Sequence, residues 1–292
     1  MIVVTAPTSN IGCQVIERLL AADAPVRVIA RDPSRLSPTV RESCEVVEGS
    51  HRDDAVVDKA FQGADAMFWL VPPDPKAPSV NAAYQDFSQA AYRAIKRHGV
   101  ARVVSVSALG RGAAKQAGLV SASLAMDDLL ASTGAHYRAL AMPTFMDNLL
   151  RQVSSLKQAG VFFSPISADL KLPTCATRDI AAVACKYLLD NHWTGYSDVP
   201  VLGPENLSFN DMAHIISQVL ETPVRYQQIP FEVFKENLLS QGMSPAMAQG
   251  VVDMMIAKNQ GLDNTTPRTA QGTTPTSLRQ WCEEVLKPAI QA

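Results

Sequence analysis

The residues best suited to chemistry lie in the first fifteen positions, where an apolar run, a turn and a helix-like segment follow one another. A strand-like run at 2–5 leads into Thr8, Ser9 and Asn10, and Gly12 lies at the start of an amphipathic stretch. A strand that turns directly into a helix brings backbone N–H groups and the positive end of the helix dipole to one point. This arrangement predicts a turn that binds the pyrophosphate of a dinucleotide.

The glycine pattern of this turn is degenerate. A GxxGxxG spacing placed at positions 6, 9 and 12 finds Ala6 and Ser9 in the first two places and only Gly12 in the third. Glycine is used there because a Cβ obstructs the approach of the backbone to a phosphate, so both substitutions put cofactor affinity in doubt. Thr8, Ser9 and Asn10 supply hydroxyl and amide donors that could hold a phosphate instead. A plain strand-to-helix turn with no ligand is the alternative.

Two arginines follow the second strand-like run. Arg31 stands where an NAD-binding protein usually carries an acidic residue for the ribose 2′-hydroxyl, and Arg35 lies one helical turn later. Guanidinium groups match phosphate oxygens well, so both residues favour NADP over NAD. The alternative is that they are solvated charges paired with Asp32.

The elements that must position these residues alternate in the manner of βαβ units through roughly the first half of the chain. The expected strands are 2–5, 26–30, 45–48, 66–71, 102–106 and 137–140, with weaker ones near 172 and at 199–202, and the expected helices are 11–22, 54–61, 81–98 and 119–132. We therefore expect an α/β fold, a Rossmann doubly wound parallel sheet over 1–143. A smaller, mostly helical C-terminal substrate lobe follows over 144–292, discontinuous because about 172–203 returns to the first domain.

Within that lobe, the apolar spacing predicts helices at 145–159, 180–190, 208–221 and 277–287, a Met-rich helical stretch at 230–258 and a flexible loop at 263–276. Ser208 and Asp211 have the spacing of a capping pair that begins the third of these helices. The methionines could form an adaptable apolar wall for a flat substrate, or fill an irregular core.

Composition narrows the class of protein. The 292 residues are 47% hydrophobic and 18% charged, with a net charge of -2, which predicts a globular chain and argues against a nucleic-acid partner. The five cysteines show no metal-ligand spacing, so we expect no metal and mostly buried, reduced thiols. Neither a signal peptide nor a membrane-length apolar run is visible, so we expect a cytoplasmic protein without a membrane contact. Monomer and homodimer both remain open.

Several segments together resemble the NmrA-like branch of the atypical short-chain dehydrogenase/reductases. They are the turn at 4–12 and the segments 28–33, 63–68, 99–108, 129–137, 143–149 and 178–181. The resemblance implies a Rossmann domain that holds NADP(H) and a lobe that closes over the substrate. It further implies cofactor contacts from a set of residues along the chain: Ala6, Thr8, Ser9, Asn10, Ile11, Gly12, Arg31, Arg35, Val71, Pro72, Ser105, Ser107, Pro143 and Phe145.

The catalytic Tyr-x-x-x-Lys pair that is usual in this superfamily is missing, because the helix expected at 119–132 has neither Tyr nor Lys. Ser107 and Lys115 are the candidates that remain for a catalytic role, although Ser107 could equally cap a turn. Asp127 and Asp128 could act as general acid or base, but adjacent carboxylates are usually solvated. Tyr137 is expected to pack in the core, and His51 could contact the cofactor.

Three functions remain open. The first is an NADPH-dependent oxidoreductase that reduces a quinone-like or other aromatic molecule, with chemistry that depends mainly on how the cofactor is oriented. The second is a non-catalytic regulator that senses NADP(H). The third is a repurposed fold that acts on an aromatic or polyketide metabolite without a nicotinamide cofactor, which the residues at positions 6 and 9 would favour.

Overall fold

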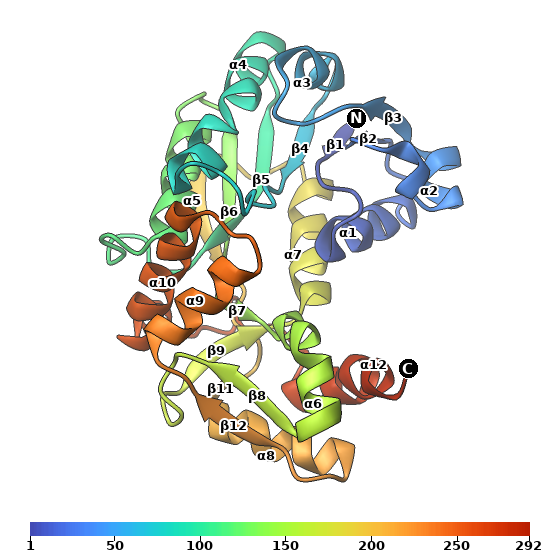
Figure 1. Ribbon diagram of the computed structural model, residues 1–292. Coiled ribbons are helices and arrows are strands. Elements are labelled where there is room, and N and C mark those ends of the chain that lie inside the picture. The colour runs from blue at the N-terminus through green and yellow to red at the C-terminus, as the bar shows by residue number, and fades with distance from the viewer. The chain divides into compact units, whose positions relative to one another are not determined.

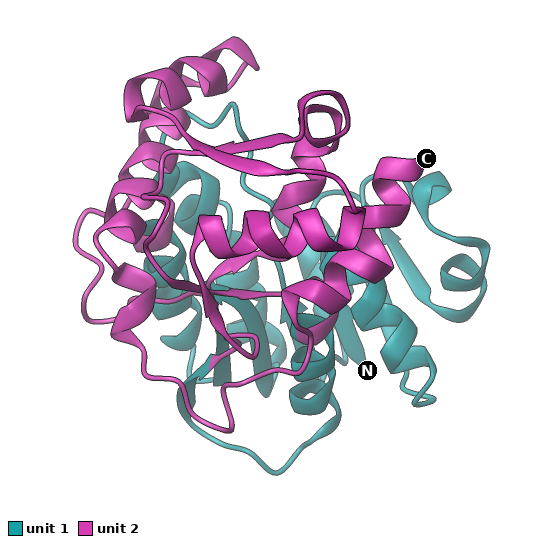
Figure 2. Cartoon of the chain, turned by 90° about the horizontal axis from the view of Figure 1, so that it is seen from below, with its two compact units in different colours: residues 1–107, 122–141, 180–199 teal, residues 108–121, 142–179, 200–292 magenta.

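The computed structural model describes residues 1–292, and the chain forms two compact units (Figure 2). Unit 1 comprises residues 1–107, 122–141 and 180–199, and unit 2 comprises 108–121, 142–179 and 200–292. Each unit encloses its own cluster of buried apolar side chains. The chain therefore crosses between the units several times. The amino-acid composition of the sequence gives no sign of where these crossings occur.

Unit 1 is built on a seven-stranded sheet of order β10-β6-β5-β4-β1-β2-β3. Its strands are β1 (Ile2–Val4), β2 (Val26–Ala30), β3 (Glu45–Glu48), β4 (Ala66–Trp69), β5 (Arg102–Ala108), β6 (His136–Met142) and β10 (Tyr196–Pro200) (Figure 1). The β1–β2, β1–β4, β2–β3 and β4–β5 pairs are parallel. This order reverses direction at β1, as in the doubly wound dinucleotide-binding sheets, and it confirms the predicted Rossmann-like fold.

Helices cover the sheet of unit 1. They are α1 (Asn10–Leu20), α2 (Pro38–Ser43), α3 (Asp54–Phe61), α4 (Gln89–His98), α5 (Leu119–Ala131) and α7 (Thr177–Leu189). Apolar side chains of α3, α4 and α5 pack with strand residues such as Val3, Met67 and Val103 in one cluster. The α1 and α7 helices pack together, since the Cys185 thiol donates to the Val15 carbonyl at 3.4 Å. The inner strands β1, β2 and β4 are almost fully buried, which explains their nearly continuous apolar character.

Unit 2 holds two small sheets and most of the later helices. A three-stranded sheet has the order β11-β9-β7, and β12 pairs in parallel with β8. The strands are β7 (Thr144–Phe145), β8 (Val161–Ser164), β9 (Leu172–Cys175), β11 (Asn206–Leu207) and β12 (Arg225–Gln228). The helices are α6 (Val153–Ala159), α8 (Phe209–Leu220), α9 (Phe231–Ser240), α10 (Pro245–Asn259), α11 (Leu278–Trp281) and α12 (Lys287–Gln291). Phe162, Ile216 and Trp281 lie in the centre of its core.

The predicted start of α8 is confirmed, because Ser208 and Asp211 form a reciprocal capping box. The prediction of a single helix at 145–159 is wrong. Phe145 belongs to β7, a 3₁₀ turn covers Met146–Gln152, and α6 begins only at Val153. The backbone there pairs with β9 before it can become helical, a long-range contact that helical apolar spacing does not reveal.

Other boundaries also differ from expectation. The strand expected at 199–202 is Tyr196–Pro200, and the Met-rich stretch is two helices, α9 and α10. The strands β8, β11 and β12 were not expected. The β11 strand has only two residues, and β12, with the sequence RYQQ, carries almost no apolar signal. The loop expected at 263–276 begins within the 3₁₀ turn Leu262–Thr265, and its Thr274 and Thr276 are buried.

All five cysteines are free thiols and four of them are buried, as expected, while Cys13 is half-buried. None of the helices combines the length and the apolar character that a membrane crossing requires.

Candidate functional site

The turn between β1 and α1 is held in a tight conformation by Ala6, Ser9 and Gly12. Ala6 adopts a left-handed conformation with φ of 50°. Ser9 caps α1, since its hydroxyl accepts from the Gly12 N–H at 3.0 Å and donates to the Ala6 carbonyl at 2.8 Å. The first motif position thus keeps the conformation for which glycine is normally chosen, although the residue is alanine. The expected Ser9 hydroxyl donor to phosphate is not free, because its hydrogen is already donated within the turn.

Gly12 is required by close packing. A Cβ at this position would lie 2.2 Å from the Ala6 carbonyl oxygen and 2.9 Å from the Ser9 Oγ. Because the helix meets the turn so closely, the third motif position is the one that tolerates no side chain. Thr8 and Asn10 are exposed on the outside of this turn, and Ile11 is buried. The first N–H groups of α1 have no acceptor within the helix, and the exposed residues Thr8 and Asn10 are their neighbours in the chain.

The carboxyl ends of β1 and β4 are tied together by one side chain. The Thr5 hydroxyl is fully buried and lies 2.8 Å from the Leu70 N–H, which donates to it. The same hydroxyl lies 3.1 Å from the Phe68 carbonyl. In this sheet order a dinucleotide would lie across the edge where these strands end. Val71 is buried and Pro72 is exposed just beyond that point.

Arg31 and Arg35 are both exposed beyond the end of β2. Asp32 caps the short turn Pro33–Arg35, and its carboxylate accepts from the Ser34 N–H at 3.0 Å and from the Ser34 hydroxyl at 2.6 Å. These hydrogen bonds, helped by the Arg35 charge, lower the pKa of Asp32. Asp32 is thus held mainly by Ser34, so pairing with the arginines is not what fixes its position.

His51 lies buried among aromatic rings beyond β3. Its ring meets Trp69 at 5.4 Å and Phe87 at 4.8 Å between centroids, edge-on in both cases. Its Nε2 is buried without a hydrogen-bond partner. Burial lowers the pKa of His51 to about 4, so the ring is neutral near pH 7. The predicted cofactor contact stays a prediction.

The carboxyl end of β5 carries a cluster of hydroxyls around one carboxylate. Asp127 of α5 is fully buried, which makes the expectation of a solvated Asp127 wrong. Its Oδ1 accepts from the Ser105 hydroxyl at 2.8 Å and from the Tyr137 hydroxyl at 2.7 Å, and its Oδ2 accepts from the Ser107 hydroxyl. Burial, followed by the Asp127 charge, raises the pKa of Tyr137 well above its usual value. Tyr137 is therefore a core residue, as expected, and also a hydrogen-bond donor.

Sequence reasoning found the members of this cluster but not their association. Ser105 and Ser107 are two positions apart on one strand, so their side chains point to the same face. Asp127 and Tyr137 come from the next helix and the next strand. The signal available in the sequence was a pair of serines at alternate positions of β5, followed by an acidic residue in the crossover helix α5.

The other predicted residues belong to unit 2. Pro143 is buried, and Phe145 of β7 pairs with Cys175 of β9. The Thr174 hydroxyl donates to the Thr144 carbonyl at 2.8 Å, which fixes this strand pair. Lys115 is exposed in the loop before α5, and no hydrogen bond or ion pair places it near a functional group. Its catalytic role stays a prediction.

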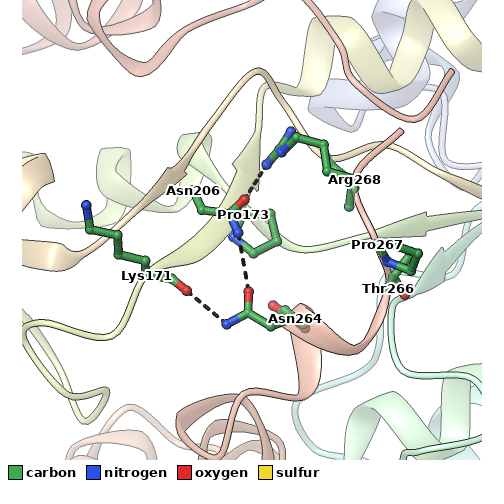
Figure 3. Close-up of a pocket in the computed structure, with 9 residues that line it drawn as sticks. Lys171, Pro173, Asn206, Asn264, Thr266, Pro267 and Arg268 are labelled. Carbon is green, nitrogen blue, oxygen red and sulfur yellow. Dashed lines mark hydrogen bonds between the residues drawn. The ribbon is translucent and has the colours of Figure 1, made fainter. Parts of the chain in front are cut away.

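Unit 2 also contains a cavity of about 360 Å³ that no sequence pattern indicated (Figure 3). Asn264 bridges its wall, donating to the Lys171 carbonyl at 3.0 Å and accepting from the Asn206 amide at 3.4 Å, while Arg268 donates to the Asn206 side chain. Asp263 also lines it and forms a buried ion pair with Lys258 at 2.5 Å. Its lining residues come from several separate segments between Lys171 and Arg268, so the cavity arises only on folding.

Comparison with known proteins agrees with this geometry. The model of the NmrA-like family matches residues 1–281. The chain is 30% identical to a (4-alkanoyl-5-oxo-2,5-dihydrofuran-3-yl)methyl phosphate reductase of Streptomyces griseus, with 97% of each chain covered. It is 25% identical to an NAD(P)H azoreductase of Xenophilus azovorans, over 87% of this chain and 86% of the relative.

A solved structure extends the likeness to three dimensions. The NADPH complex of an NADPH-dependent quinone oxidoreductase from Escherichia coli superposes with a TM-score of 0.80 at 21% identity, covering 98% of this chain and 100% of the other. At that identity the likeness establishes the fold. The family match over nearly the whole chain establishes kinship, and the chain is a member of the NmrA-like family.

Proposed function

We propose that this protein is an NADPH-dependent reductase that delivers hydride to an electron-poor aromatic or quinone-like small molecule. That it is an NAD(P)H-dependent oxidoreductase follows from its kinship with named reductases along almost their whole length. The choice of NADPH and the class of substrate are the parts that need support from the residues themselves.

The geometry of the turn between β1 and α1 carries the proposal. Ala6 has the left-handed backbone, and Gly12 has the Cβ-free close approach, that a pyrophosphate turn needs. The degenerate glycine pattern therefore leaves the backbone shape intact. Ser9 accepts from the Gly12 N–H, so the N–H groups of Asn10 and Ile11 and the positive end of the α1 dipole remain for a ligand at the sheet edge where β1 and β4 end. The residues present therefore fit a dinucleotide.

Arg31 and Arg35 support NADPH in preference to NADH. Both guanidinium groups are exposed beyond β2, the strand next to β1, where a ribose 2′-phosphate would lie in this fold. The carboxylate of Asp32, the acidic residue between them, accepts two hydrogen bonds from Ser34, so it competes less with a phosphate for the two guanidinium groups. A bidentate phosphate contact is the role that arginine performs better than lysine.

The substrate class rests on the absence of the usual proton-transfer pair and on the relatives. NADPH would supply the hydride, so the protein needs chiefly to orient the acceptor against it. No residue of α5 is a tyrosine or a lysine. The azoreductase and the quinone oxidoreductase are named for conjugated acceptors, in which the added charge is delocalised without a strong acid nearby.

Turnover tests the proposal directly. The purified protein should oxidise NADPH, followed by its absorbance, when a quinone or an azo dye is offered, and should oxidise NADH much more slowly. NADPH binding without oxidation by any conjugated acceptor would contradict the reductase and would instead fit a nucleotide-sensing regulator.

Substitution of Arg31 tests the cofactor preference. Arg31→Ala should weaken NADPH binding about tenfold or more and leave NADH binding nearly unchanged, because a charge-assisted hydrogen bond contributes about 1.5–3 kcal/mol. Arg41→Ala removes an equally exposed arginine from α2 and serves as the matched control. Equal losses for both nucleotides would rule out a 2′-phosphate contact.

A further inference from the structure

We propose that Asp127 is a positioning residue that fixes Ser107 as a hydrogen-bond acceptor at the carboxyl edge of β5. Ser107 then receives a hydrogen bond from an N–H or O–H group of the nicotinamide half of the cofactor, and it does not protonate the substrate. This inference rests on the proposed NADPH site, and it assigns a direction to one hydrogen bond within it.

The direction follows from what each group can donate. A carboxylate only accepts hydrogen bonds, whereas a serine hydroxyl has one hydrogen and two lone pairs. The hydroxyls of Ser105, Ser107 and Tyr137 all converge on Asp127. Each of them must therefore point its hydrogen at the carboxylate. The lone pairs of these hydroxyls are all that is left for another partner.

Of the three hydroxyl-bearing residues, Ser107 is the least buried. Ser105 and Tyr137 are fully buried, whereas Ser107 is 7% exposed near the last residue of β5. The Tyr137 ring also stacks on Tyr196 with ring centroids 5.7 Å apart, which helps to fix the phenol that donates to Asp127. A buried carboxylate held from several sides resists rotation, because breaking any one bond leaves a polar group unpaired.

The position of Ser107 selects the nicotinamide half. The turn that would hold the pyrophosphate follows β1. In the strand order β4 and then β5 lie on one side of β1, whereas β2, which precedes Arg31, lies on the other side. A dinucleotide lying across the ends of these strands has its adenosine toward β2 and its other half toward β5. The hydrogen-bond donors of that half are the carboxamide N–H₂ and the ribose hydroxyls, and these are the groups that an acceptor can bind.

Binding and turnover of two variants test the assignment. Ser107→Ala should weaken NADPH binding about tenfold in calorimetry, the loss typical of one hydrogen bond, while turnover at saturating NADPH stays within about threefold of wild type. Asp127→Asn places an N–H₂ group toward Ser107, which turns the serine hydrogen outward, so NADPH binding should fall at least as far. The double variant should lose no more than Asp127→Asn alone, because both changes act on one hydrogen bond.

Ser88→Ala is the matched control, since it removes another fully buried serine hydroxyl of unit 1, the one that accepts from the Trp69 indole at 3.2 Å. Its NADPH affinity should equal that of wild type. A fall of about a hundredfold or more in turnover of Ser107→Ala at saturating NADPH would identify a proton donor and overturn the assignment.

The NADPH site and the role of Ser107 and Asp127 can be refuted separately. Wild-type protein that binds no NADPH would overturn the proposed function and this inference together. Wild-type protein that binds NADPH, with Ser107→Ala binding equally well, would overturn only the role given to Ser107 and Asp127. If Asp127→Asn does not fold, Ser107→Ala alone still decides between these results.

Discussion

The left-handed backbone at Ala6 predicts an unusual response to Ala6→Gly. An L-residue in this region costs about 1–2 kcal/mol, and glycine removes that cost. The substitution also removes a mostly buried methyl group, which costs about 0.8 kcal/mol. Glycine raises the conformational entropy of the unfolded chain as well, which costs about 0.4–1 kcal/mol. Because Ala6 has a φ of 50° and is 9% exposed, these effects nearly cancel. We expect the free energy of unfolding to change by less than about 0.5 kcal/mol.

A buried alanine with ordinary backbone provides the matched control. Ala60 lies fully buried within α3, so Ala60→Gly loses the methyl group and the helical preference with no strain to release. It should lower the free energy of unfolding by about 2 kcal/mol. Urea unfolding at unchanged slope measures both variants. Equal losses in the two variants would refute the claim that strain is stored at Ala6.

Two further predictions follow from the same unit. In Gly12→Ala the new Cβ would lie 2.2 Å from the Ala6 carbonyl oxygen. Urea unfolding should therefore show that the free energy of unfolding falls by about 1–3 kcal/mol, and calorimetry should show weaker NADPH binding. A variant with unchanged stability and binding would contradict the close packing. Burial lowers the pKa of His51 from 6.5 to about 4, so between these pH values only the unfolded chain takes up the proton. The free energy of unfolding should therefore fall by about 3 kcal/mol more for wild type than for His51→Leu as the pH drops from 7 to 4, and parallel pH curves would exclude this cause.

The sheet of unit 1 could be predicted from the sequence because most of its strands are buried and rich in valine and isoleucine. The runs at 26–30 and 102–106 each contain three such residues within five positions. Unit 2 was harder, because β7 and β11 are two residues long and exist only through pairing with β9. Propensity has little to act on in such short segments, so tertiary contacts decide.

The candidate site divides in the same way. The turn holding Ser9 and Gly12 could be predicted as a strand-to-helix turn, since it is a local structure of neighbouring residues. The role of Asp127 could not, because two adjacent acids are usually solvated and only the fold brings hydroxyls from β5 and β6 to one of them. The left-handed Ala6 was also invisible, because alanine seldom adopts that conformation.

Nucleotide binding by the intact protein is the most direct test of the central claim, that the turn between β1 and α1 with Arg31 holds NADPH. Calorimetric titration with NADPH and, separately, with NADH should show NADPH bound at least about tenfold more tightly, the effect of one charge-assisted contact to the 2′-phosphate. Equal affinities would contradict the role of Arg31. Binding of neither nucleotide would contradict the cofactor site itself and show that the altered glycine turn has lost its ligand.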